Sequence, residues 1–362
     1  SPAARRLLRI RRRFPDTSLR NILCAVSPEQ VMVLLDRVVE AAVRRKSIRL
    51  HTLPFGMVAM DGKATAIDDV KHPLVQRHHH EERGLTFGLV RTITSCLVNA
   101  QGSPCIGAYP VPARTNEAGV FEAAFGRLQR TFGGLFRLVS YDAGAASEAN
   151  ADLIKEAGKD YLFQVADENR LAYKMANELL AAKQRAHAED RHTVDNQTTV
   201  IRKVFIHKIF DWKHNRKKTY HQHFWMHTRT VLRVSAETWR NDERVSVDDR
   251  YFVSSMRSHE LTALQWLHAV RLHWGVETHC HGTFDIAFKE DDKPWIEADG
   301  NGTLVVMLLR RVAYTLMALF RGVSLKSEDR RDMPRKKLQS WVKTTLVALQ
   351  QSHVTRQTSV PP

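Results

Sequence analysis

Cysteine is scarce in this chain of 362 residues, with 4 scattered positions and no Cys-x-x-Cys pair. Such spacing excludes a disulfide framework and a zinc ribbon, and it favours a reducing, cytoplasmic environment. The sequence also lacks an uninterrupted apolar run of about 20 residues, which a bilayer-spanning helix requires. The longest run, residues 304–320, contains Arg310 and Arg311. It therefore predicts a buried helix and no membrane partner.

Acidic residues are outnumbered by basic ones. Lys and Arg number 55 against 39 Asp and Glu, a formal net charge of +16, and 18 His add to the capacity for positive charge. This balance predicts a polyanionic partner, a role that nucleic acid, a membrane surface or heparin would fill equally well. The basic segment 1–14 lacks the apolar stretch of a secretory signal, so it is interpreted as a trimmed N-terminus.

An N-terminal helical region is predicted for residues 1–50. The segment SPEQVMVLLDRVVEAAVRR opens with Ser27 as a cap and Pro28 in the first turn, and it places Gln30 where a capping box requires it. Apolar residues follow at helical spacing. Because the region is basic, we expect it to hold phosphates without reading a sequence.

Strand and helix patterns then alternate, which indicates an α/β core. The first part of this core is assigned to residues 51–167, with short β-type runs and helical stretches at 117–132 and 146–157. Residues 168–250 break the alternation, because they are rich in His, Lys and Arg and carry two β-type runs. This segment predicts a β-rich insertion.

The second part of the core is assigned to residues 251–325. It begins with a helix whose apolar stripe includes Leu264, Leu267 and Val270. The remaining residues, 326–362, form a polar, charged tail.

Two of the β-type runs end in an aspartate followed by a small residue. Asp61 ends the run in MVAMDGK and Asp142 the run in FRLVSYDAG, so each carboxylate is expected to project from a strand end. Adjacent strands would bring the two close enough to share a hard cation such as Mg²⁺. Glu277, one to two turns beyond Val270, is expected to add a third oxygen ligand from a helix. An Asp before Gly is also typical of an ordinary turn, and the pattern alone leaves both interpretations open.

At these residues the chain resembles the DDE transposases of bacterial insertion sequences, in particular the H-repeat-associated group. The resemblance runs from about residue 14 to residue 340. Its most specific block is HWGVETHCHGTFDIAFKED at 273–291. Further blocks are DGK at 61–63, NE at 116–117, DA at 142–143, AGKDYLFQV at 157–165, RYFVSS at 250–255 and LRRVAYTLMALFR at 309–321.

The resemblance implies an RNase H-like core, with a mixed five-stranded sheet flanked by helices, a β-rich insertion and an N-terminal helical region. It implies that Asp61, Asp142 and Glu277 are the catalytic acids and the ligands of two Mg²⁺ or Mn²⁺ ions. Such a pair of ions activates a water or a 3′ hydroxyl for in-line attack on a phosphodiester. The active-site companions of the family fall on His273, His281 and Asp285.

The implied partners are the double-stranded DNA of the element ends and of the target, held by a homodimer in the bacterial cytoplasm at the nucleoid. The residues expected to contact this DNA are Lys63, Lys213, Arg216, Lys217, Lys218, Arg229 and Arg233. The cluster in DWKHNRKKTYH mixes cations with aromatic rings, which suits a DNA end. The histidines of RHHHEE at 77–82 and HQHFWMH at 221–227 could instead bind zinc, but on a strand the second set suits a DNA-facing ribbon better.

The chain departs from the family pattern at several positions. ATAIDD follows Asp-Gly-Lys where the family has a Leu-Arg-Gly-Ser type of continuation. Ala166 stands where the family has a lysine, and Thr278 and Gly282 replace an Asn and a Trp. Three functions therefore stay open: an active transposase, a diverged or domesticated transposase that binds DNA without catalysis, and a sequence-independent nuclease.

Overall fold

A single mixed β-sheet runs through the protein in a computed structural model that describes residues 15–168, 170–180, 185–195, 197–209, 225–323, 333–334, 336–341 and 344. Within these residues the sheet has 10 strands. The strands of its first part lie in the order β4 (Cys105–Val111), β3 (Leu85–Leu97), β1 (Met57–Ile67), β5 (Leu138–Tyr141) and β6 (Asp160–Val165). β3 is antiparallel to β1 and β4, whereas β5 is parallel to β1 and β6.

Antiparallel strands continue this sheet beyond β6. The order there is β10 (Glu243–Ser254), β9 (Thr230–Arg240), β8 (Thr198–Lys208) and β7 (Ala188–Thr193). β10 joins the two parts, because its last four residues pair with β6 while its whole length pairs with β9. The mixed α/β architecture is thus as predicted, but the sheet is wider than five strands.

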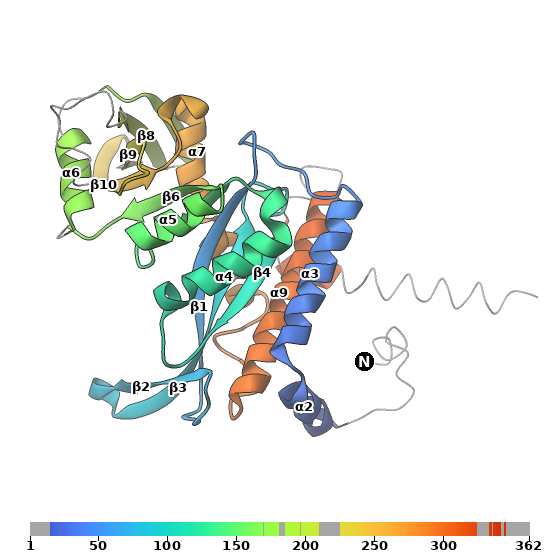
Figure 1. Cartoon of the computed structure of the whole chain (residues 1–362). Helices are drawn as coiled ribbons and strands as arrows, with labels where there is room; N and C mark the ends of the chain where they lie inside the picture. Colours follow the sequence, from blue (N-terminus) through green and yellow to red (C-terminus); the bar gives the residue numbers. More distant parts are fainter. Residues whose placement is uncertain are drawn as a thin grey trace, which may run out of the picture.

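Helices cover the first part of the sheet. α3 (Pro28–Arg44) packs along α9 (Gly300–Val323) and against β4, and α4 (Glu117–Phe132) packs against β4 and β3. Figure 1 shows α3 and α9 side by side, with α4 beside the strands β1 and β4. The predicted helix at 27–45 is confirmed, since α3 buries an apolar face that includes Leu35 and Val39. Ser27 stands at its N-cap without a side-chain capping hydrogen bond, so the predicted capping box is wrong.

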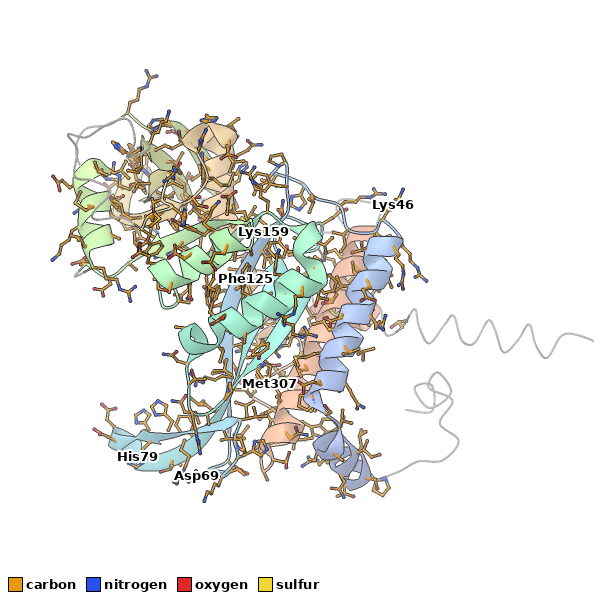
Figure 2. All side chains as sticks on the ribbon, in the orientation of Figure 1. Lys46, Asp69, His79, Phe125, Lys159 and Met307 are labelled. Atoms are coloured by element: carbon orange, nitrogen blue, oxygen red, sulfur yellow. The ribbon has the colours of Figure 1, made fainter. Side chains whose placement is uncertain are left out.

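α9 is the main core helix and contains the apolar run at 304–320. Within the described residues it is the one helix long and apolar enough to cross a membrane, yet 67% of its apolar window is buried inside the fold. This burial is what a core helix requires. Met307 of α9 and Phe125 of α4 lie in the body of the molecule, whereas His79 lies on the projecting hairpin of β2 (Val75–His80) and β3 (Figure 2).

The remaining helices position the acidic residues and the second part of the sheet. They are α2 (Asp16–Ala25), α5 (Glu148–Glu156), α6 (Leu171–Leu180), α7 (Ala263–His273), the π-helical turn η6 (Val276–His281) and α8 (Gly282–Ile286), with 3₁₀ turns η1 (Glu81–Arg83), η2 (Gly133–Leu135) and η5 (Ser258–Glu260). α7 buries Leu267 and Val270, as expected. Leu264 is 44% exposed, so its place in the predicted apolar stripe is wrong.

Candidate active site

The register of two parallel strands determines where the aspartates lie. β1 pairs with β5 up to Met60 opposite Tyr141, so Asp61 and Asp142 are the next residues along two adjacent strands. Asp142 follows the end of β5, as predicted. Asp61 does not end its strand, because β1 continues to Ile67 in pairing with the longer β3. The β5 side of β1 is therefore unpaired from Asp61 onward, and this gap gives the aspartates an open edge.

Glu277 approaches from the opposite side on a π-helical turn. The prediction placed it on an α-helix, but residues Val276–His281 have π-helical hydrogen bonding. The same segment is held against the strands at two points. His281 Nδ1 lies 3.2 Å from Asp61 Oδ2, and His273 Nδ1 lies 3.1 Å from Ser140 Oγ on β5. Both predicted companion histidines thus contact the strands that carry the aspartates.

The carboxylates influence one another electrostatically. Burial raises the pKa of Glu277 above its ordinary value, and the negative charges of Asp61 and Asp142 raise it further, against the opposing effect of His281. Burial likewise raises the pKa of the phenol of Tyr141, with added effects from Asp61 and Asp142. Asp61 and Asp142 lie side by side after β1–β5 partners, and the His281–Asp61 contact holds the turn that carries Glu277 at the same edge. We refer to these three residues, which are far apart in the sequence, as the acidic centre.

Glu117 is a fourth carboxylate in this centre, and the site prediction from the sequence did not include it. It is the first residue of α4, whose N-cap Asn116 accepts a hydrogen bond from the Gly119 backbone N–H at 2.9 Å. A Cβ on Gly62 would lie 2.3 Å from the Glu117 carboxyl, so that carboxyl occupies the space of the missing side chain at the residue after Asp61. Burial, Asp61 and Asp142 all raise the pKa of Glu117, against Arg91. The Asn-Glu block at 116–117 was the signal in the sequence.

Asp285 and Lys63 form a separate ionic cluster next to this centre. Lys63 Nζ lies 2.8 Å from Asp285 Oδ1 and 2.8 Å from both carboxylate oxygens of Asp291. Burial lowers the pKa of Lys63, but the bonds to the two aspartates outweigh it and leave the pKa above its ordinary value. Lys63 was predicted to contact DNA. In this structure its side chain is 11% exposed and its charge is matched by carboxylates.

The other predicted DNA contacts fall into two groups. Arg233 stacks over the Phe205 ring at 4.0 Å and is 12% exposed, and Arg229 donates to backbone oxygens of Met226 and Thr228. These two arginines thus make contacts within the fold. The cluster in DWKHNRKKTYH, with the predicted DNA contacts Lys213, Arg216, Lys217 and Lys218, lies outside the described residues. Two of the histidines considered as zinc ligands, His221 and His223, lie outside them as well.

The acidic centre has the donor chemistry of a hard divalent cation. Its side chains offer carboxylate oxygens, the ligands that Mg²⁺ and Mn²⁺ prefer. Within the described residues no three His, Cys, Asp or Glu side chains stand in a metal-chelating arrangement, and this applies to the strand histidines at 78–80 as well. The donors therefore fit Mg²⁺ or Mn²⁺ in type.

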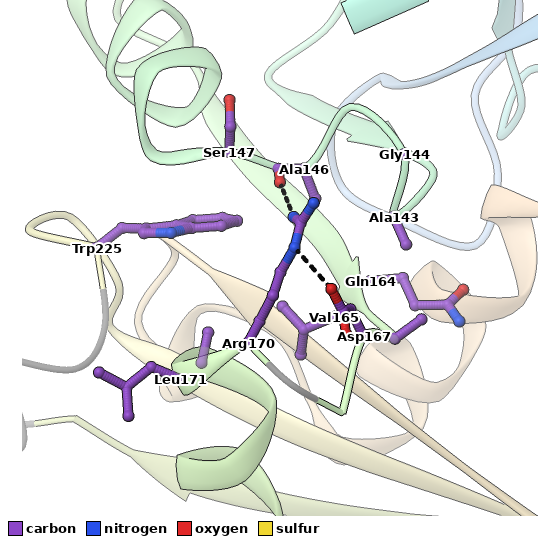
Figure 3. A pocket seen from close by; sticks show the side chains of 12 residues that line it. Ala143, Gly144, Ala146, Ser147, Gln164, Val165, Asp167, Arg170, Leu171 and Trp225 are labelled. Atoms are coloured by element: carbon purple, nitrogen blue, oxygen red, sulfur yellow. Dashed lines mark hydrogen bonds and ion pairs between the residues drawn. The ribbon is translucent and has the colours of Figure 1, made fainter.

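A cavity of about 530 Å³ lies beside the loop that follows Asp142. Its lining includes Gln164, Arg170 and Trp225 (Figure 3). Arg170 Nη1 donates to the Ala146 backbone oxygen at 2.9 Å, and Arg170 Nε forms an ion pair with Asp167 at 3.4 Å. Arg170 therefore ties the loop after Asp142 to the segment after β6, in the region where Ala166 replaces the lysine of the family.

Known proteins match this chain in sequence and in structure. An H repeat-associated putative transposase of Escherichia coli (strain K12) is 26% identical over 168 residues, which cover 43% of this chain and 41% of that protein. The solved structure of piggyBac transposase in a synaptic complex with hairpin DNA aligns with a TM-score of 0.41 and 13% identity, over 84% of this chain and 54% of that chain. The family model described as "Transposase DDE domain" matches residues 64–316, the greater part of the chain, so the chain belongs to the transposase DDE domain family.

Proposed function

We propose that this protein is a DDE-type transposase that catalyses metal-dependent cleavage and strand transfer of the DNA of an insertion sequence. The observation that supports the proposal is that Asp61 and Asp142 follow paired residues on β1 and β5, while His281, in the turn that carries Glu277, contacts Asp61 at 3.2 Å. Membership of the family implies dependence on a divalent metal. We assign the site two Mg²⁺ or Mn²⁺ ions.

The strands β4, β3, β1, β5 and β6 correspond in this proposal to an RNase H-like core. Their order, with β3 antiparallel and β5 and β6 parallel to β1, places two acids at the centre of the sheet. Residues 51–167 and 251–325 form this core, and 168–250 form an insertion between its parts. Residues 1–50 form an N-terminal DNA-binding region, and 326–362 form a tail.

Each side chain has a defined task. Asp61 and Asp142 would hold the cations between adjacent strands, and Glu277 would complete the set from η6. His281, through its contact with Asp61 Oδ2 at 3.2 Å, orients that carboxylate, while His273 holds the end of α7 against β5. When bound, the cations supply Lewis acidity toward the phosphodiester and its attacking oxygen. Glu117 adds negative charge that favours cation binding.

The substrate in this proposal is double-stranded DNA, comprising the element ends and a target, held by a homodimer at the nucleoid of a bacterial cytoplasm. The net charge of +16 supports a polyanionic substrate. Free cysteines at all 4 positions, Cys24, Cys96, Cys105 and Cys280, support a reducing compartment.

The test is cleavage of labelled duplexes taken from the DNA that flanks the coding sequence of this chain, with and without Mg²⁺ or Mn²⁺. The unsubstituted chain is expected to cut at the element boundary only with the cation, and Asp142→Asn is expected to reduce cutting to background. Asp292→Asn is the matched control, because Asp292 is exposed and paired with Lys289 at 3.0 Å. Cutting that survives Asp142→Asn would refute the assignment.

A second function, DNA binding without catalysis, is favoured by the departures from the family pattern around Lys63, Ala166 and Thr278. It predicts that the unsubstituted chain and Asp142→Asn bind the flanking DNA equally and that neither cuts it. Thermal unfolding with Mn²⁺ adds an independent measurement. A Tm that rises with Mn²⁺ in the unsubstituted chain but not in Asp142→Asn supports the transposase.

A further inference from the structure

A groove lies between the second part of the sheet and the segment that carries Glu277. Its volume is about 750 Å³. Its floor is one face of β8, β9 and β10, on which three successive rungs are in register: Val200, Thr238 and Ser246, then Arg202, Ala236 and Asp248, then Val204, Val234 and Arg250. The small side chains of Ala236, Thr238 and Ser246 leave part of this face open. The wall comprises α7 and the residues leading into η6, including His268, Arg271, Trp274 and His279.

The groove is lined by three arginines, from β8, β10 and α7. Two of them have acidic partners: Arg250 pairs with Asp248 at 2.8 Å, and Arg271 pairs with Asp190. Arg202 differs, because its Nη1 atom is buried without a hydrogen-bond partner, and within the described residues no acidic side chain forms an ion pair with it. A guanidinium atom removed from water without a partner costs free energy unless a ligand satisfies it.

Arg250 connects this groove to the acidic centre. Its guanidinium lies 4.8 Å from the centre of the Trp274 ring, three residues before Glu277. Its positive charge also opposes the rise in the pKa of Glu277 and adds to the fall in the pKa of His273. A ligand in the groove would therefore extend toward the catalytic carboxylates.

We propose that this groove binds the sugar-phosphate backbone of a DNA strand beside the cleavage site, with a phosphate oxygen accepting a hydrogen bond from the Arg202 guanidinium. Guanidinium groups recognise phosphate through charge-assisted, directional hydrogen bonds. The alternation of small floor residues with arginines suits a ribbon-like ligand that follows the strands. This inference rests on the proposed transposase function, and it names the surface by which that function would hold DNA.

The opposite face of the same sheet does not offer this arrangement. Arg233 lies there in register with Phe205 and Tyr251, and Tyr251 donates to Asn177 of α6 at 2.8 Å. α6 packs against β8, β9 and β10. The face that the sequence pattern favoured for DNA is thus packed against α6, whereas the groove lies on the other face.

The test is fluorescence polarisation of a short labelled DNA duplex with the full chain, at salt concentrations from about 50 to about 200 mM. Arg202→Gln is expected to weaken binding about tenfold, because it removes one charged hydrogen bond. It should also lower the slope of log K against log salt by about 0.9, the value for one phosphate contact. Arg202→Lys, which keeps the charge, should retain part of the affinity.

Arg191→Gln is the matched control, because it removes the same charge from β7. Asp190 lies opposite Arg202 in register, so its neighbour Arg191 points to the other face, where its side chain is 68% exposed. We expect less than a twofold change, with thermal unfolding confirming that both variants fold. An equal loss of DNA affinity in Arg191→Gln, or no loss in Arg202→Gln, would overturn the proposal that the groove binds DNA.

The inference and the function that it rests on fail in different ways. If Arg202→Gln binds DNA like the unsubstituted chain while Asp142→Asn still abolishes cutting, the groove is refuted and the transposase stands. If the unsubstituted chain neither binds nor cuts DNA, both proposals are refuted.

Discussion

At the scale of single residues, Gly62 explains how a fourth carboxylate enters the acidic centre. The position has no side chain, and the space that a Cβ would occupy is filled by the Glu117 carboxyl at 2.3 Å. The motif Asp-Gly-Lys therefore combines an acid with an opening for another acid. Gly56 has a different role, because a Cβ there would lie 1.9 Å from the Leu135 backbone oxygen.

Gly62→Ala is expected to cost less than about 1 kcal/mol of stability, because the end of the Glu117 side chain can rotate away. Gly56→Ala should cost more, about 1–3 kcal/mol, because a backbone atom cannot rotate away. Displacing Glu117 should weaken the stabilisation by Mn²⁺ in Gly62→Ala. Thermal unfolding with and without Mn²⁺ measures both effects. In a Glu117→Ala background, Gly62→Ala should have no further effect on the response to Mn²⁺, and an additional loss there would contradict this explanation.

His273 makes stability depend on pH. Burial lowers the pKa of this side chain below its ordinary value of 6.5, against the opposing effects of Asp61 and Asp142. The unfolded chain then takes up a proton below about pH 6.5 that the folded chain does not, so this contribution is present above that pH and is lost as the pH falls toward the folded pKa. The loss proceeds at up to about 1.4 kcal/mol per pH unit.

His273→Gln should therefore reduce the difference in unfolding free energy between neutral and mildly acidic pH. Denaturant unfolding of both proteins at several pH values on either side of 6.5 measures this difference. The exposed His192 on β7 provides the control variant, His192→Gln. Parallel pH profiles for the unsubstituted chain and His273→Gln would show that His273 does not cause the dependence.

At the scale of elements, α9 is joined to the segment after α8 by a buried ion pair. Arg311 Nη1 lies 2.9 Å from both carboxylate oxygens of Glu290, and both side chains are 0% exposed. Arg311 also donates to Thr92 on β3 at 3.1 Å and to the Met307 backbone oxygen at 2.8 Å. One residue thus connects the core helix, the sheet and the segment that follows η6 and α8.

Glu290→Gln should destabilise the fold by about 3–5 kcal/mol, because it leaves the Arg311 charge buried without its counter-ion. Replacing both partners, as Glu290→Leu with Arg311→Met, should recover most of that loss. Asp292→Asn, at an exposed pair, should cost less than about 1 kcal/mol. Denaturant unfolding compares all three. A Glu290→Gln protein as stable as Asp292→Asn would rule out the proposed structural role.

The elements were predicted unevenly, for a physical reason. α3 carries apolar residues at helical spacing and α9 carries a long apolar run, and both helices were expected from these local patterns. The π-helical turn at Val276–His281 has no such local pattern. It was predicted as an α-helix, because Glu277 lies only one to two turns beyond Val270 in the apolar stripe of the preceding helix.

At the scale of the whole molecule, the long strand β10 joins the core part of the sheet to the part that forms the floor of the groove. Its last four residues pair with β6 of the core, and the residues before them supply Asp248 and Arg250 to the groove. Figure 1 shows β8, β9, β10 and α7 gathered on one side of the molecule, away from α3 and α9. The continuous sheet therefore connects the proposed DNA groove to the acidic centre.

The sequence by itself determined the α/β class and the family resemblance, and through that resemblance it singled out Asp61, Asp142 and Glu277, because these depend on residue identity and local spacing. Only the tertiary structure decided that Glu117 lies against Gly62, that Lys63 is paired with Asp285 and Asp291, and that Arg202 rather than Arg233 faces an open groove. The alternation of side chains along a strand is local, but which face becomes covered depends on helices distant in the sequence.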